Sequence, residues 1–137
     1  MKEYVTDTHG LIWHLTDDDR KMGVLAKETF KEADHGICII WIPTICLIEM
    51  IYLCEKPKQL ISQAMVKNLL EQLKPDTSYR TVALTKEIVL ASIKIPRSLI
   101  PDMPDRIIAA TALFLNCPLI TLDNQISKYA AIDTVWH

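Results

Sequence analysis

A 24-residue stretch beginning at Pro101, PDMPDRIIAATALFLNCPLITLDN, constrains the fold of this chain more than any other. Residues 105–115 are apolar almost all round, which predicts a helix that is buried on more than one side. The Asn-Cys-Pro sequence ends that helix, and residues 119–122 form an apolar run that predicts a strand. Eleven helical residues cover roughly 16 Å, which is close to the span of five extended residues. If the strand runs antiparallel to the helix, Asp123 returns to the side of Asp105.

The rest of the chain alternates between short apolar strands and helices. Strands are predicted at residues 4–7, 37–42, 81–84, 119–122 and 132–136. Helices are predicted at residues 8–15, 20–35, 44–54, 58–74, 85–95 and 105–115. This order predicts an α/β fold in which a mainly parallel sheet of four or five strands is sandwiched between helices. The length of 137 residues fits one domain that spans residues 1–137.

Some local features predict where helices begin. Negative charge near a helix N-terminus is favourable, so the triplet Asp17–Asp19 is interpreted as the start of the second helix. Thr44 is interpreted as the cap of the third helix. Gly10 lies early in the first helix, where a better helix former is expected.

One segment imitates a membrane span. Residues 37–54, ICIIWIPTICLIEMIYLC, hold a single charge. A bilayer crossing needs about 20 apolar residues, and an acid near its centre costs about 3 kcal/mol on insertion scales. A Pro-Thr pair also divides the run, so we expect a strand, a turn and a helix of a water-soluble protein with no membrane partner. The N-terminus lacks the apolar core of a signal peptide.

The cysteine pattern also bears on the compartment. The sequence has no CxxC pair and no histidine at zinc-site spacing from a cysteine. We therefore expect buried, reduced thiols in a cytoplasmic protein. The four cysteines are Cys38, Cys46, Cys54 and Cys117.

Four acids are expected to meet at one edge of the sheet. Right-handed crossovers bring the C-terminal ends of parallel strands to the same edge, where open α/β sheets bind ligands. Asp7 and Asp123 end predicted strands, while Glu49 and Asp105 lie in the opening turns of predicted helices. Glu49 is the one charge in its apolar run, and an unpaired buried carboxylate is costly.

Taken singly, these acids also have structural explanations. Asp102 and Asp105 have the spacing of a capping box. Asp123, followed by an asparagine, is typical of a turn after a strand. Glu49 could pair with Lys56 or face solvent at an edge. It is the coincidence of all four acids that favours a functional site.

The chemistry of such a cluster indicates a metal-dependent nuclease. Carboxylates within a few ångströms of one another repel, which raises some of their pKa values. A hard divalent cation relieves the repulsion, and oxygen ligands without His or Cys favour Mg²⁺ or Mn²⁺ over zinc. Two such ions can activate water and stabilise the leaving oxygen of a phosphodiester. The net charge is −2, but without the four acids the remainder is positive, so phosphate binding is allowed.

Three stretches resemble the PIN-domain family, and within it the VapC-type ribonuclease toxins of bacterial and archaeal toxin–antitoxin systems. They are VTDTHGLIWHL near the N-terminus, PDMPDRIIAATAL, and LITLDNQI followed by a terminal VW. The resemblance covers essentially the whole chain and implies a PIN-like three-layer α/β/α sandwich. The acids that match the family's metal site are Asp7, Glu49, Asp105 and Asp123.

The resemblance implies a Mg²⁺-dependent endoribonuclease, with Mn²⁺ as the alternative ion, that acts on RNA. It also implies a homodimer that is neutralised by a cognate antitoxin protein. Our mechanistic hypothesis is that Asp7 and Asp105 hold the main metal. Glu49 and Asp123 would then complete a second site or orient water.

Further residues are expected to support these four acids. The family often has a hydroxyl residue two positions before its final acid, and Thr121 matches it. The D-x-x-D-R form gives supporting positions to Asp102 and Arg106, the latter meeting substrate phosphate or facing solvent. His9 is interpreted as a proton shuttle or a packing residue. The three tryptophans are expected to serve the core or an interface rather than to act as base-stacking platforms; they are Trp13, Trp41 and Trp136.

Two other functions are consistent with parts of the sequence. The first is a catalytically inactive PIN-like module that binds or scaffolds. The second is a phosphoacceptor domain of the receiver type, which also has acids at the edge of an α/β sheet. That chemistry needs a lysine at the end of a late strand, and after Leu122 the first lysine is Lys128.

Overall fold

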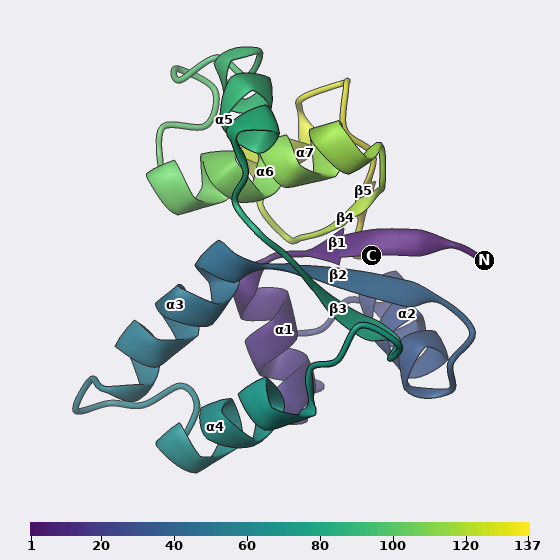
Figure 1. Cartoon of the computed structure of the whole chain (residues 1–137), viewed down its shortest axis with the longest axis vertical. Coiled ribbons are helices and arrows are strands. Elements are labelled where there is room, and N and C mark those ends of the chain that lie inside the picture. Colours follow the sequence, from purple (N-terminus) through teal and green to yellow (C-terminus); the bar gives the residue numbers. More distant parts are fainter.

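The computed structural model describes all residues from Met1 to His137 and contains a five-stranded sheet (Figure 1). The strands are β1 (Glu3–Thr6), β2 (Ile39–Pro43), β3 (Tyr79–Val82), β4 (Leu119–Ile120) and β5 (Thr134–Val135). They lie in the order β3-β2-β1-β4-β5, and every neighbouring pair is parallel. The predicted parallel sheet is confirmed.

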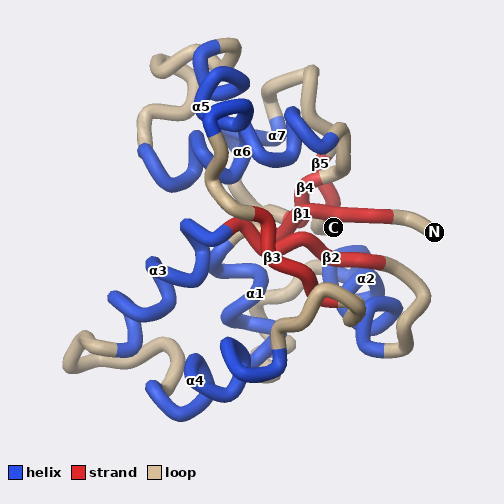
Figure 2. The backbone as a smooth tube through the Cα atoms, in the orientation of Figure 1, coloured by secondary structure: helices blue, strands red, loops and turns tan.

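Seven helices cover the two faces of this sheet. They are α1 (Thr8–Leu15), α2 (Val24–Asp34), α3 (Thr44–Cys54), α4 (Gln63–Gln72), α5 (Lys86–Ile93), α6 (Met103–Leu115) and α7 (Asn124–Ser127). Helices α1 to α4 lie on one side of the strands and α5 to α7 on the other (Figure 2). The three-layer α/β/α sandwich is therefore confirmed. None of the helices combines the length and the apolar character that a bilayer crossing requires.

The middle strands are buried on both faces, which explains their continuous apolar sequences. Val5, Ile40 and Ile42 have no exposed surface. Helix α6 packs against β1, and its small residues Ala109 and Ala110 are also fully buried. Small side chains allow the helix backbone to come close to the strands.

The strand order places a switch point between β1 and β4. The chain builds β2 and β3 outward on one side of β1, and then returns to add β4 and β5 on the other side. The connections on the two sides of such a point diverge, which leaves a crevice at the C-terminal ends of the strands. Any site at this crevice is built from the residues that follow β1 and β4.

The start of α2 differs from the prediction. The helix begins at Val24, with Gly23 at its N-cap, rather than at the Asp17–Asp19 triplet. Asp17 instead adopts a left-handed conformation with φ 57° in a turn. The reason is a tertiary contact that local charge does not encode: Ala26 N in the first turn donates to Trp136 O, at the other end of the chain.

Other element bounds also shift. β3 lies two residues earlier than predicted. Helix α4 begins only after Ser62, whose Oγ accepts a hydrogen bond from Met65 N at 3.2 Å. Thr44 is the first residue of α3 rather than a side-chain cap. The predicted strand at 119–122 stops at Ile120, and the unpredicted helix α7 follows. All four cysteines are free, and three of them are buried, but Cys117 is partly exposed.

Gly23 should be sensitive to any side chain. A Cβ at this position would lie 2.0 Å from Trp136 O and 2.6 Å from Trp136 C, so Gly23→Ala must displace the C-terminal backbone. We expect a loss of about 1–3 kcal/mol in the free energy of unfolding, measured by thermal melting, together with altered tryptophan fluorescence. Gly36→Ala is the control. A Cβ there would lie 4.0 Å from Ser78 Oγ, an ordinary contact, so only the strain of its φ of +73° should cost stability, about 1 kcal/mol, without changing the fluorescence. Wild-type stability in Gly23→Ala would contradict this packing.

Candidate active site

The four predicted acids lie around one cavity at the C-terminal edge of the sheet. Its volume is about 390 Å³. The acids come from four separate places in the chain: the end of β1, helix α3, helix α6 and the β4–α7 turn. The cavity is lined by Asp7, Thr8, His9, Trp13, Glu49, Asp102, Asp105, Leu122 and Asp123. The catalytic roles of these acids stay predictions.

Asp7 follows β1 and caps α1. Its Oδ1 accepts a hydrogen bond from Gly10 N at 2.8 Å, and its Oδ2 accepts one from Thr121 Oγ1 at 2.6 Å. Burial raises the pKa of Asp7, while these two hydrogen bonds oppose the rise. A Cβ on Gly10 would lie only 2.8 Å from Asp7 Oδ1. The glycine that weakens the helix therefore makes room for the carboxylate.

Glu49 reaches the cavity from the second turn of α3. Its Oε1 accepts a hydrogen bond from Thr8 Oγ1 at 2.5 Å. Thr8 is buried, with 3% of its surface exposed, in the first turn of α1. The partner of Glu49 is thus a hydroxyl beside Asp7 rather than Lys56, and this bond ties α3 to α1 at the cavity.

Of the two acids with capping-box spacing, Asp102 caps helix α6 and Asp105 lines the cavity. Asp102 is the N-cap of α6, and its Oδ2 accepts from Asp105 N at 3.1 Å. The carboxylate of Asp105 is left to face the cavity. Burial, followed by the negative charges of Asp102, Asp123 and Glu49, raises the pKa of Asp105 to about 7. The part of this shift that comes from the three neighbouring charges means that the acids are close enough to repel one another.

Asp123 also has a structural role. It caps α7, with Oδ1 accepting from Gln125 N at 2.8 Å and from Ile126 N at 3.2 Å. Thr121 links it to Asp7, because the Thr121 hydroxyl donates to Asp7 Oδ2 and accepts from Asp123 N at 3.1 Å. The alternation of side chains along a strand predicted that Thr121 and Asp123 face the same way. That stays a prediction, because β4 ends at Ile120 and the bond between the two residues involves the backbone N of Asp123 rather than its carboxylate.

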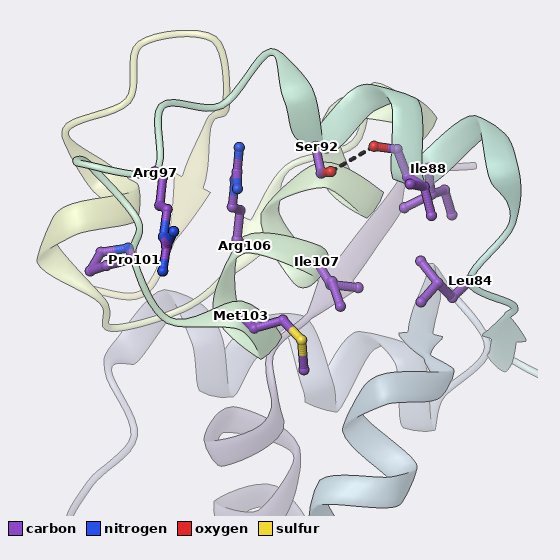
Figure 3. Close-up of a pocket in the computed structure, with 9 residues that line it drawn as sticks. Leu84, Ile88, Ser92, Arg97, Pro101, Met103, Arg106 and Ile107 are labelled. Atoms are coloured by element: carbon purple, nitrogen blue, oxygen red, sulfur yellow. Dashed lines mark hydrogen bonds between the residues drawn. The ribbon is translucent and has the colours of Figure 1, made fainter.

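Arg106 lines a different cavity, of about 400 Å³, between α5 and α6 (Figure 3). Its Nε and Nη2 both donate to Ile95 O, at 3.1 and 2.9 Å. Arg106 and Arg97 lie at one end of this cavity, with Leu84 and Ile88 at the other. A contact of Arg106 with substrate phosphate stays a prediction. The position of the Arg106 side chain beside α5, away from the four acids, does not favour such a contact.

Sequence reasoning missed the part that Thr8 and Leu122 play in lining the cavity. Both lie directly beside an acid in the sequence, and that adjacency was the only available signal. It also did not identify Trp13 as a wall of the cavity. That position depends on how α1 leaves β1, which no local pattern specifies.

The donor set fits a hard cation such as Mg²⁺. Five of the nine lining residues are Asp or Glu, and a sixth is Thr8. Burial and then the neighbouring negative charges raise the pKa of Asp105, and a cation would relieve the repulsion among those charges. No three Asp, Glu, His or Cys side chains converge closely enough to ligate one ion together. Mg²⁺ needs no such group, because it usually binds through one or two carboxylates and keeps several waters.

Thr121→Val tests whether the hydroxyl positions the acids. The two side chains are nearly isosteric, but valine removes both hydrogen bonds of Thr121. We expect Mg²⁺ affinity to fall by roughly 10- to 100-fold, as for other groups that orient metal ligands, measured by calorimetry. Thr111→Val is a matched control, because Thr111 is equally buried at 2% but bonds only to Ile107 O within α6. Equal losses in both variants would contradict the positioning role.

The fold and the cavity together define a class of protein: an α/β domain with a carboxylate-lined cavity at the switch point of a parallel sheet. A family model described as the PIN domain matches residues 4–132. The chain belongs to the PIN-domain family. A comparison with curated proteins gives no significant match.

Several solved structures share this fold. VapBC2 from Rickettsia felis, bound to a DNA fragment from its promoter, has a TM-score of 0.71 at 15% identity, covering 98% of this chain and 99% of that one. A toxin–antitoxin complex from Klebsiella pneumoniae has a TM-score of 0.65 at 20% identity, covering 94% of each chain. FitAcB from Neisseria gonorrhoeae has a TM-score of 0.64 at 14% identity, covering 96% and 95%. At identities this low, the similarity to these structures shows a shared fold and nothing more.

Proposed function

We propose that this protein is a Mg²⁺-dependent endoribonuclease and the toxin of a type II toxin–antitoxin pair of the VapBC kind. The observation that carries the proposal is the convergence of four carboxylates from separate elements on one cavity. Membership of the PIN-domain family supports it, because PIN domains are typically nucleases that use divalent metals. Similarity to toxin–antitoxin structures supports the toxin role.

Within this proposal Asp7 and Asp105 hold the main ion, which Mn²⁺ could replace. A bound ion supplies charge neutralisation at the phosphodiester and activation of water. Asp7 is oriented for this role by Gly10 N and Thr121 Oγ1, and its oxygens keep lone pairs that these bonds do not use. Asp105 would also gain from a cation, since burial and the neighbouring acids all raise its pKa.

Glu49 and Asp123 complete the cavity in the same proposal. Each has one oxygen engaged by the protein, Glu49 by Thr8 and Asp123 by the first turn of α7. The second oxygen of each carboxylate remains available to a second ion or to a water that it would orient. These local bonds hold the two side chains in place before any ligand arrives.

The alternative function is a catalytically inactive PIN-like module. Incubating the purified protein with RNA and Mg²⁺ or Mn²⁺, against an EDTA control, separates the two. Cleavage that requires the metal supports the proposal. Intact RNA under all conditions would favour the inactive module, and metal-independent cleavage would contradict the mechanism.

We also propose a cognate antitoxin protein and a homodimer as partners, and a cytoplasmic location. The antitoxin follows from the toxin–antitoxin complexes among the similar structures. The homodimer is supported by the outer face of α5, where Val89, Leu90 and Ile93 are 50%, 55% and 70% exposed, since contiguous exposed apolar residues often mark an interface. The free, mostly buried thiols support the location.

A further inference from the structure

The cavity lined by the carboxylates, called the acidic cavity below, has one wall made of aromatic and apolar side chains. Its lining contains five carboxylates and no lysine or arginine, but it includes Trp13, His9 and Leu122. An RNA strand that enters therefore meets like charge from the lining itself. A bound cation can offset this repulsion near the acids, but it cannot hold the nucleotide's base. Affinity for the base must come from the apolar wall.

Trp13 is held firmly in that wall. Its ring packs edge-on against Trp136 at a centroid distance of 5.7 Å, and Trp136 is 6% exposed. His9 lies one helical turn earlier on α1, with its ring 5.7 Å from that of Trp13. On the solvent side, the exposed Lys21 places its Nζ over the Trp13 ring, 5.7 Å from the centroid. An aromatic surface and a flexible cation thus stand together beside the acids.

We propose that Trp13 is the base-stacking residue of the acidic cavity, flanked by His9, and that Lys21 pairs with a phosphate of the same RNA strand. This inference rests on the proposed RNA-cleaving function. Stacking on an aromatic side chain tolerates any base, because every base has a π face. Trp13 therefore positions a nucleotide next to the carboxylates without reading its identity. The cavity volume of about 390 Å³ lies within the usual size of small-molecule sites, about 300–1,000 Å³.

The first experiment measures tryptophan fluorescence during titration with uridine 5′-monophosphate and, separately, with ribose 5-phosphate, both with Mg²⁺. The two probes carry the same phosphate, and only the first carries a base. We expect saturable quenching by the nucleotide alone. The quenching should vanish in Trp13→Leu and persist in Trp41→Phe, because Trp41 lies on β2 and lines a different cavity.

The second experiment measures binding of a single-stranded oligouridylate in EDTA as a function of salt. Trp13→Leu should weaken binding by roughly 5- to 100-fold with little change in the salt slope, since stacking involves no counterion release. Trp13→Phe should recover part of the affinity. Lys21→Ala should instead reduce the slope of log affinity against log salt by about 0.7.

The outcomes separate this inference from the proposed function. Base-dependent quenching in a protein that cleaves no RNA would support the stacking role and contradict the nuclease. RNA cleavage with equal responses to the two probes would support the nuclease and overturn the stacking role, as expected if the wall receives an antitoxin side chain instead. If Trp13→Leu melts early, three other measurements still decide: the wild-type fluorescence titration and the RNA affinities of Trp13→Phe and of the exposed His9→Ala variant. The inference is overturned if the nucleotide does not quench the wild-type fluorescence and both variants bind RNA with wild-type affinity.

Discussion

Asp105→Asn is expected to lower Mg²⁺-dependent RNA cleavage by roughly a hundredfold or more, the size of effect seen when a group that stabilises transition-state charge is removed. Asparagine keeps the size of the side chain. It also keeps the start of α6, because the capping bond runs from the backbone N of residue 105 to Asp102. The substitution therefore removes a charge from the cavity and little else. Cleavage of a labelled RNA under single-turnover conditions measures the effect.

The matched control for this experiment is Asp133→Asn. Asp133 is an exposed acid just before β5, at the opposite end of the sheet from the cavity. The same loss of one negative charge there should leave cleavage unchanged. Cleavage by Asp105→Asn at the wild-type rate would show that the acidic cavity is not where RNA is cut. Equal losses in both variants would show that overall charge, rather than the site, governs activity.

The apparent affinity for Mg²⁺ should depend steeply on pH, because Asp105 has a pKa of about 7 without metal. A protonated carboxyl cannot ligate the ion, so binding below that pKa must release a proton. Affinity should therefore fall by up to tenfold for each pH unit below 7, or by roughly a hundredfold between pH 7 and pH 5. Calorimetry across this range, in buffers of different ionisation enthalpy, measures both the affinity and the proton release.

The same pKa shift predicts the pH dependence of stability in the metal-free protein. The folded state has a raised pKa for Asp105, so between about pH 4 and pH 7 it binds more protons than the unfolded state. The free energy of unfolding should therefore decrease as pH rises through this window, and Asp7, whose pKa is also raised, acts in the same direction. Thermal melting at pH 5 and pH 8 measures the difference.

Asp105→Asn and Mg²⁺ provide the controls for this stability effect. The variant should melt higher than wild type at pH 8 without metal, because it removes the repulsion among the acids. Mg²⁺ should stabilise the wild type more at pH 8 than at pH 5, and should stabilise the variant less than the wild type at pH 8. A metal-free wild type that becomes more stable as pH rises from 5 to 8 would contradict the raised pKa.

Several features of the fold could be read from the sequence because they depend on local patterns. The apolar run around Ile40 indicated a buried parallel strand, and the helix at 105–115 followed by a short strand indicated an αβ unit. These patterns have the period of the element that they form, so they predict its type well. They predict ends poorly, as the start of α2 shows, since Gly23 and Trp136 meet across almost the whole chain.

The sequence by itself determined the parallel α/β fold and the expectation that Asp7, Glu49, Asp105 and Asp123 meet, because strand direction and right-handed connections follow from chain chirality and local periodicity. Only the tertiary structure decided how each carboxylate is held. The bonds from Thr121 to Asp7 and from Thr8 to Glu49 join residues 114 and 41 positions apart. Such contacts depend on side-chain direction at distances of a few ångströms, which no periodic pattern in the sequence specifies.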